Sequence, residues 1–182
     1  INGVTIEKFD LKKLNENERM NILFEIMIVF HYIHSIGYVY RDLKNDNIII
    51  DENNTAILID LDRVLYAENK IIYDKCSFNL ENDYRAPEIK DNQPYTNKVD
   101  IYSLGCLINE YFIIKENIDN INSKLKIMAK CCLQKDPNDR PTISQLIRYF
   151  YLYILSTFDT IQEINIKLIE ILEYNFMIKD IF

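Results

Sequence analysis

The sequence predicts a mainly helical fold with one small β-hairpin, and three observations support this. Apolar residues recur every three or four positions from Ile22 to Ile33, which is the spacing of a single buried helix face. Two short apolar runs, 48–50 and 56–59, flank the turn-forming sequence Asp-Glu-Asn-Asn, as is typical of a hairpin. Further helical patterns occupy most of the chain after residue 98.

The first helix is expected within residues 5–35. Asn15 or Asn17 could cap its start, and Gly37 stands where a glycine commonly follows a helix end. After the hairpin, residues 62–97 show no stable period, which predicts a long functional loop containing a short helix after Pro87.

Four later helices are predicted from apolar periodicity and from the prolines that interrupt it. Their expected ranges are 98–114, 121–134, 143–155 and 160–175.

The composition limits the functions that are possible. The chain has 182 residues, is 48% hydrophobic and carries a net charge of −7, which indicates a globular domain and argues against nucleic acid or anionic membrane as partners. No apolar run reaches the ~18–20 residues of a spanning helix, and no signal peptide opens the chain. Four cysteines are too few for a disulfide framework in a domain of this size, so we expect reduced thiols and an intracellular, cytoplasmic location.

Glycine is scarce, with three residues in the whole chain, at positions 3, 37 and 105. Their wide separation excludes a Gly-rich phosphate loop, a Walker P-loop and a nucleophile elbow within this sequence. Any nucleotide chemistry must proceed without such a loop or take it from another part of a protein.

The residues that suggest chemistry lie around the predicted hairpin. Asp42 is followed five positions later by Asn47, and Asp60 comes directly after the second strand. This is the arrangement that phosphoryl transfer requires: one carboxylate accepts the proton of the attacking hydroxyl, while an amide and a second carboxylate hold Mg²⁺. Lys44 could stabilise the phosphoryl group during transfer.

Here the chain closely resembles the carboxyl-terminal lobe of a eukaryotic protein kinase, from residue 1 to about 155. Five segments match the family's motifs in order, and they are Tyr40-Arg41-Asp42, Asp60-Leu61-Asp62, Ala86-Pro87-Glu88, 100–105 and 135–142. The resemblance implies a protein kinase that uses ATP and Mg²⁺ to phosphorylate Ser or Thr in protein substrates. It makes Asp42 and Lys44 catalytic, and Asn47 and Asp60 metal ligands.

The resemblance also implies structural and regulatory roles. Asp100 would hold the backbone of the catalytic loop, and Glu88 would form a buried ion pair with Arg140. Arg41 would bind a phosphate on the loop 62–85, with Tyr66, Tyr73 and Ser77 as the candidate acceptors.

The sequence departs from the family in several places. The small amino-terminal lobe, which carries the Gly-rich loop, is expected to be missing from this chain, and the piece is expected to be inactive alone. Asp62 replaces a glycine that allows unusual backbone conformations. The family's Gly-Thr pair aligns with Leu80-Glu81, and residues 156–182 form an extension outside the resemblance.

Two other functions remain open. A kinase-like lobe without turnover could serve as a binding or scaffold module. A small-molecule phosphotransferase uses similar carboxylates, and Asp60-Leu61-Asp62 favours it, whereas the Ala-Pro-Glu segment speaks against it.

Overall fold

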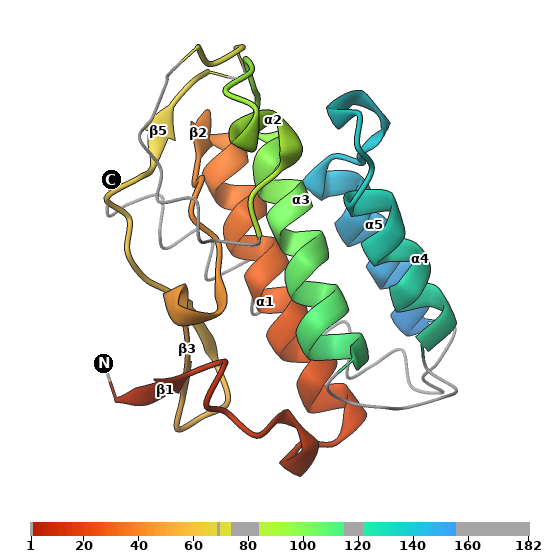
Figure 1. The fold of residues 1–182 in the computed structure, drawn as a ribbon. Coiled ribbons are helices and arrows are strands. Elements are labelled where there is room, and N and C mark those ends of the chain that lie inside the picture. Colours follow the sequence, from red (N-terminus) through yellow and green to blue (C-terminus); the bar gives the residue numbers. More distant parts are fainter. Residues whose placement is uncertain (1, 69, 74–83, 115–121, 156–182) are drawn as a thin grey trace. The chain divides into compact units, whose positions relative to one another are not determined.

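The computed structural model describes residues 2–68, 70–73, 84–114 and 122–155 (Figure 1). The chain divides into two compact units, Ile1–Ile147 and Arg148–Phe182. The helices and strands follow in the order β1 (Gly3–Thr5), α1 (Glu16–Ser35), β2 (Tyr38–Val39), β3 (Ile48–Asp51), β4 (Ala56–Leu58), β5 (Leu65–Tyr66), α2 (Pro87–Lys90), α3 (Lys98–Leu107), α4 (Asn122–Cys132) and α5 (Ile143–Leu155).

The predicted hairpin is confirmed, but it belongs to a larger sheet. β3 and β4 pair antiparallel, with Ile48 opposite Leu58. The other edge of β3 pairs antiparallel with β1, which gives a three-stranded sheet in the order β1-β3-β4. β1 was not predicted, because three residues are too few to show a strand's alternating pattern.

The helix expected over 5–35 is therefore wrong in its first part, since α1 begins only at Glu16. Asn15 caps it in a capping box: the Asn15 side chain accepts from the Glu18 N–H, and the Glu18 side chain accepts from the Asn15 N–H. At the other end Gly37 has a φ of +84°, as expected for the residue after a helix. The cap residues thus set both ends of this helix.

A second, two-stranded sheet joins the segment before Asp42 to the segment after Asp60. β2 pairs antiparallel with β5, and the rings of Tyr38 and Tyr66 meet edge to face with centroids 5.1 Å apart. Further along the predicted loop, Ile72 forms an isolated bridge with Tyr95. The described part of residues 62–97 is therefore more ordered than its lack of period suggested, because backbone pairing to distant segments needs no local periodicity.

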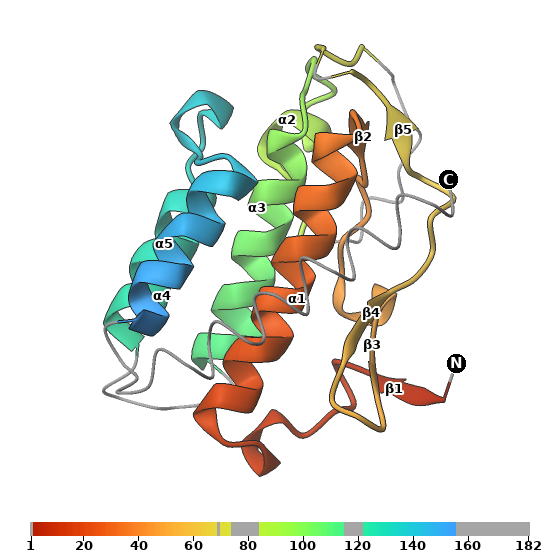
Figure 2. The same cartoon turned by 180° about the vertical axis from the view of Figure 1, so that it is seen from behind.

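Two helices form the centre of the first unit. Figures 1 and 2 show α1 and α3 side by side, with the small sheets against α1 and α4 against α3. The predicted helix 98–114 is an α-helix only to Leu107 and continues as a π-helical segment, Ile108–Ile114. Gly105 allows α3 and α4 to approach closely, because a Cβ on Gly105 would lie 2.6 Å from Cβ of Cys132.

The hydrophobic core extends through both central helices. Its most deeply buried members include Leu23, Met27 and Phe30 on α1 and Leu104 and Leu107 on α3. No helix in the described part of the chain is long and apolar enough to cross a membrane. The helix predicted over 160–175 lies outside the described residues, as do Ser77 and Leu80-Glu81.

Candidate catalytic site

Asp42 follows β2, and the backbone just before it is held by Asp100 from the first turn of α3. The carboxylate of Asp100, which is 1% exposed, accepts hydrogen bonds from the backbone N–H groups of Tyr40 at 2.8 Å and Arg41 at 2.7 Å. Nε2 of His34, in the last turn of α1, lies 2.8 Å from the same carboxylate. One buried side chain thus joins both central helices to the loop that carries Asp42.

Tyr40 connects this loop to the start of the Asp60 segment. Its ring is fully buried and packs edge to face on Phe30, and its hydroxyl donates to the carbonyl of Ile59, the residue before Asp60. Burial raises the pKa of the Tyr40 phenol, and the nearby charge of Asp42 raises it further. The hydroxyl therefore stays protonated and remains a hydrogen-bond donor at ordinary pH.

Three cationic side chains surround the buried carboxylate of Asp42. Lys44 Nζ lies 3.9 Å and Arg63 Nε 3.5 Å from Oδ2, and both side chains are about one-third exposed. Arg85 Nη2 lies 3.6 Å from Oδ1, and Arg85 is only 5% exposed. The carboxylate is therefore paired with a cation on each of its oxygens.

Asn47 and Asp60 are brought together by the hairpin. The carbonyl of Asn47 accepts from the N–H of Ile59 at 2.9 Å, which extends the β3–β4 pairing to the residue before Asp60. The amide nitrogen of Asn47 donates to the carbonyl of Asp42 at 2.8 Å, so its amide oxygen is the atom left to offer to a metal. An amide oxygen and a carboxylate fit Mg²⁺, which takes its other ligands from water and phosphate.

No group of three or more His, Cys, Asp or Glu side chains that could hold a metal ion occurs among the described residues. A metal at this position would therefore rest on the pair Asn47 and Asp60 together with ligands from a nucleotide.

Two residues of this site have an unusual backbone conformation. Among the described residues, five other than glycine have positive φ, and two of them are Arg41 at +72° and Asp60 at +61°. Such conformations cost a residue with a β-carbon about 1–2 kcal/mol and often mark functional sites. Asp62 stands where the family has a conformationally free glycine, but its φ is not positive, whereas that of Asp60 is.

The side chain of Arg41 is half-buried and donates two hydrogen bonds to other parts of the fold. Its Nε donates to the carbonyl of Arg63 at 2.6 Å, and Nη1 donates to the hydroxyl of Tyr95 at 3.0 Å. Of the candidate acceptors, Tyr66 and Tyr73 are 56% and 74% exposed, and Ser77 lies outside the described residues. Arg41 therefore links the loop that carries Asp42 to the segment after Asp60.

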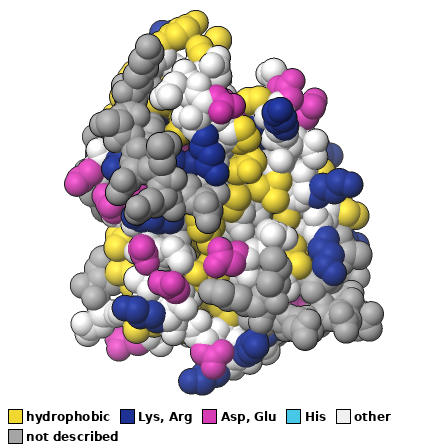
Figure 3. All heavy atoms as spheres, viewed as in Figure 1, with side chains coloured by type: hydrophobic (Ala, Val, Ile, Leu, Met, Phe, Trp, Pro, Cys, Tyr) yellow, Lys and Arg dark blue, Asp and Glu magenta, His cyan; other side chains and the backbone are white. Residues whose placement is uncertain are grey.

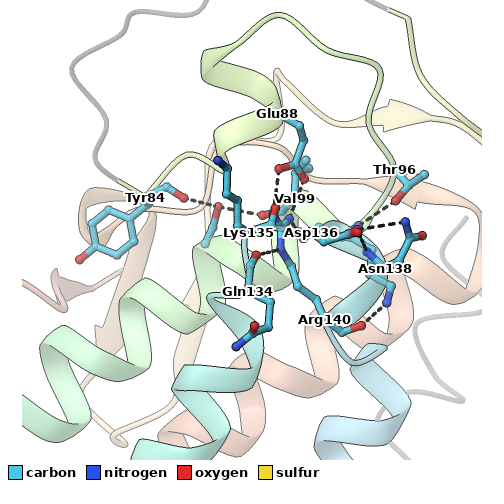
Figure 4. A network of polar contacts seen from close by, with 11 residues as sticks. Tyr84, Glu88, Thr96, Val99, Gln134, Lys135, Asp136, Asn138 and Arg140 are labelled. Carbon is cyan, nitrogen blue, oxygen red and sulfur yellow. Dashed lines mark hydrogen bonds and ion pairs between the residues drawn. The ribbon is translucent and has the colours of Figure 1, made fainter.

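Arg140 is the centre of a network of polar contacts (Figure 4). Nη1 and Nη2 donate to the two carboxylate oxygens of Glu88 at 2.6 and 2.8 Å. The remaining N–H groups donate to the backbone carbonyls of Gln134, Lys98 and Lys135. The guanidinium also lies over the ring of Tyr102, 5.0 Å from its centroid. All five donors are satisfied, so the segment around Glu88 is fixed to the start of α3 and to the chain before α5.

Tyr84, two residues before Ala86, is bound by the second half of α3 and by the π-helical segment after it. Ser103 Oγ donates to the carbonyl of Tyr84 at 2.8 Å, and the Tyr84 hydroxyl donates to Glu110 in the π-helical segment. Burial raises the pKa of Tyr84, and the hydrogen bond to Glu110 raises it further, so this hydroxyl also remains a donor.

The structure thus brings Lys44 and Asn47 to Asp42 and places the residue before Asp60 against Asn47. It also pairs Glu88 with Arg140 across 52 residues of sequence. Sequence reasoning missed Arg63 and Arg85 as neighbours of Asp42, and His34 as a partner of Asp100. Arg85 does precede the Ala-Pro-Glu segment directly, but its burial could not be inferred from that position.

One face of the molecule carries side chains of mixed character. On the face shown in Figure 3, acidic and basic side chains are interspersed, with hydrophobic side chains between them. Leu61, Tyr66, Ile71 and Tyr73 are all more than half exposed.

The comparisons with known proteins show which family the chain belongs to. A family model described as "Protein kinase domain" matches residues 4–118, which is more than half of the chain. The chain belongs to the protein kinase family.

Several curated kinases resemble the chain over much of its length. Mitogen-activated protein kinase kinase kinase 3 of Arabidopsis thaliana is 29% identical over 177 residues, which cover 84% of this chain and 29% of that protein. The probable CTD kinase subunit alpha homolog of Encephalitozoon cuniculi is 36% identical over 102 residues, 56% of this chain and 30% of the relative. A probable inactive serine/threonine-protein kinase of Dictyostelium discoideum is 26% identical over 160 residues, 70% of this chain and 13% of the relative. The chain thus spans less than one-third of each of these relatives.

Proposed function

We propose that this chain is the large, carboxyl-terminal lobe of a protein kinase that transfers the γ-phosphate of ATP to Ser or Thr residues of proteins. The observation that carries the proposal is the position of Asp42. It is buried beside Lys44, on a loop whose backbone is hydrogen-bonded to Asp100. Asn47 lies next to it and is hydrogen-bonded to Ile59, the residue before Asp60.

In the proposed reaction the hydroxyl oxygen of the acceptor forms a bond to the γ-phosphorus, and the bond from that phosphorus to the ADP oxygen breaks. Asp42 orients the hydroxyl and accepts its proton. Lys44 stabilises the negative charge on the transferred group. Asn47 and Asp60 would hold Mg²⁺, which supplies neutralisation of the phosphate charge.

The test compares four proteins in a phosphate-transfer assay with ATP, Mg²⁺ and a protein substrate. We expect the 182-residue chain to be inactive alone, because the other half of a kinase nucleotide site lies in a small lobe. The chain extended through the sequence upstream of Ile1 should transfer phosphate, and Asp42→Asn should abolish the transfer. Asp46→Asn is the matched control, because Asp46 is an exposed carboxylate in the same loop.

The alternatives give different results. A binding or scaffold module predicts no transfer from the extended chain. A small-molecule phosphotransferase predicts transfer to metabolites but not to protein. Transfer that survives Asp42→Asn would contradict the proposed mechanism.

We further propose that phosphorylation of Tyr66, Tyr73 or Ser77 regulates the enzyme through Arg41. A phosphate adds a charge of about −1.5 to −2 and can form charge-assisted bonds with arginine. The exposure of Tyr66 and Tyr73 supports this, because a modifying enzyme could reach both. If blocking substitutions at all three positions leave the rate of the extended chain unchanged, this proposal fails.

A further inference from the structure

Arg85 differs from the other two cations next to Asp42 in its burial. Lys44 and Arg63 are 32% and 37% exposed, whereas Arg85 is 5% exposed. A guanidinium that is removed from water needs a counter-charge close by, and the carboxylate of Asp42, itself 4% exposed, lies 3.6 Å away. The attraction between two charges is also stronger where water is excluded. Of the three cations, Arg85 therefore interacts with Asp42 most strongly.

The residues on either side of Arg85 are held in place by contacts with the rest of the fold. On one side Tyr84 is bound through its carbonyl to Ser103 and through its hydroxyl to Glu110. On the other side Ala86 is 1% exposed and packs in a cluster with Val99. The backbone at Arg85 is therefore fixed on both sides by the helical segment that runs from α3 into the π-helical turn.

The two oxygens of Asp42 face different groups. Oδ1 faces Arg85, while Oδ2 faces Arg63 and, at 3.4 Å, the amide nitrogen of Asn47. Groups on both sides of a carboxylate fix its rotation, and an error of about 1 Å in a reacting group can cost about 100-fold in rate. A carboxylate that must accept a proton from a bound hydroxyl depends on such an orientation.

We propose that Arg85 is a positioning residue that sets the orientation of Asp42 and couples the Ala-Pro-Glu segment to the catalytic loop. The inference rests on the proposed function, in which Asp42 accepts the proton of the substrate hydroxyl. Arg85 acts through Asp42 and has no contact with substrate in this role. The buried ion pair also implies that loss of the Asp42 charge destabilises the fold.

The first arm of the test measures stability and needs no activity. Urea unfolding is followed for the full-length protein, Asp42→Asn, Arg85→Gln and the double variant. We expect each single variant to lower the unfolding midpoint. The double variant should lose much less than the two single losses added together, because neither charge is then left unpaired. Arg63→Gln provides the matched comparison and should couple less strongly to Asp42→Asn, since the Arg63 side chain is more exposed to water than that of Arg85. Additive losses for Arg85 and Asp42 would overturn the inference.

The second arm measures phosphate transfer. We expect Arg85→Gln to lower kcat about 10- to 100-fold while KM for the protein substrate changes less than about threefold. Arg85→Lys should recover part of kcat because it restores the charge without the planar fork. Lys70→Gln, an exposed change on the same segment, should leave both constants unchanged.

The outcomes separate the inference from the proposed function. A rise in KM with normal kcat would mean that Arg85 binds substrate, and it would overturn a positioning role. The losses of stability at Arg85 and Asp42 could be non-additive while the parent protein transfers no phosphate. That result would refute the proposed function, and Arg85 would then have a structural role alone. Coupling together with the loss of kcat supports both.

Discussion

Arg140 binds Glu88 through two parallel hydrogen bonds, Nη1 to Oε1 at 2.6 Å and Nη2 to Oε2 at 2.8 Å. Both residues are buried, and the pair joins the start of α2 to the chain just before α5. Because the Arg140 side chain also binds three backbone carbonyls, its removal would disturb several segments at once.

We predict that Glu88→Gln lowers the free energy of unfolding by about 3–5 kcal/mol, because it leaves the Arg140 charge buried without its partner. Arg140→Lys should also destabilise the protein, since an ammonium cannot form the two parallel bonds. Urea unfolding monitored by circular dichroism measures both changes. The control is the exposed pair Lys70–Glu68, where Lys70→Gln should cost less than about 1 kcal/mol. Equal losses at the two pairs would contradict this prediction.

The carboxylate of Asp100 is expected to slow hydrogen exchange at the backbone amides just before Asp42. Asp100→Asn replaces one acceptor oxygen by an amide NH2 group, which cannot accept a hydrogen bond from the backbone N–H of Tyr40 or Arg41. Each lost hydrogen bond to a charged group costs about 1.5–3 kcal/mol. Hydrogen exchange should therefore accelerate at the amides of Tyr40 and Arg41, which donate to Asp100. Asp91→Asn, at an exposed carboxylate, is the control; unchanged exchange in Asp100→Asn would show that other contacts hold the loop.

Tyr40 should give the protein a distinct dependence on alkaline pH. Its pKa is raised in the folded state by burial, and in the unfolded chain it returns to about 10. Below pH 10 the phenol is protonated in both states, so its contribution to stability is complete there. Above pH 10 the unfolded chain releases the proton first, so stability falls as the pH rises.

Tyr40→Phe should remove this part of the alkaline loss. It should also lower stability at pH 8 by about 1–3 kcal/mol, because the carbonyl of Ile59 loses its donor. Urea unfolding at pH 8 and pH 11 measures both effects, with Tyr73→Phe as a control at an exposed ring. The prediction would be contradicted if Tyr40→Phe lost as much unfolding free energy between pH 8 and pH 11 as the parent protein.

The close approach of α3 and α4 at Gly105 should make alanine unfavourable there. A Cβ would lie 2.6 Å from Cβ of Cys132, and rotation of a side chain cannot relieve a contact between two Cβ atoms. We expect Gly105→Ala to destabilise the protein by about 1–3 kcal/mol, although alanine normally favours a helix. Cys132→Gly removes the opposing Cβ, so the double variant should lose less than the sum of the two single changes. Thermal unfolding decides this, and additive losses would exclude the clash.

Much of this fold could be predicted from local sequence patterns. The capping box at Asn15, the turn glycine Gly37 and the hairpin of β3 and β4 depend on neighbours within a few residues. Patterns of this kind are visible in the chain itself. The candidate residues Asp42, Lys44, Asn47 and Asp60 were found in the same way, since the loop and the hairpin that carry them are continuous in sequence.

Other features were decided only by the tertiary structure. The strands β1, β2 and β5 are two or three residues long and exist because a distant segment offers its backbone to pair with. Asp100 and Arg85 reach the catalytic loop from positions about 60 and 43 residues away. Burial of a charged side chain depends on what packs around it, and that information is spread over the whole chain. The sequence by itself therefore determined which residues are candidates for the chemistry, whereas long-range packing decided which charged groups lie beside them.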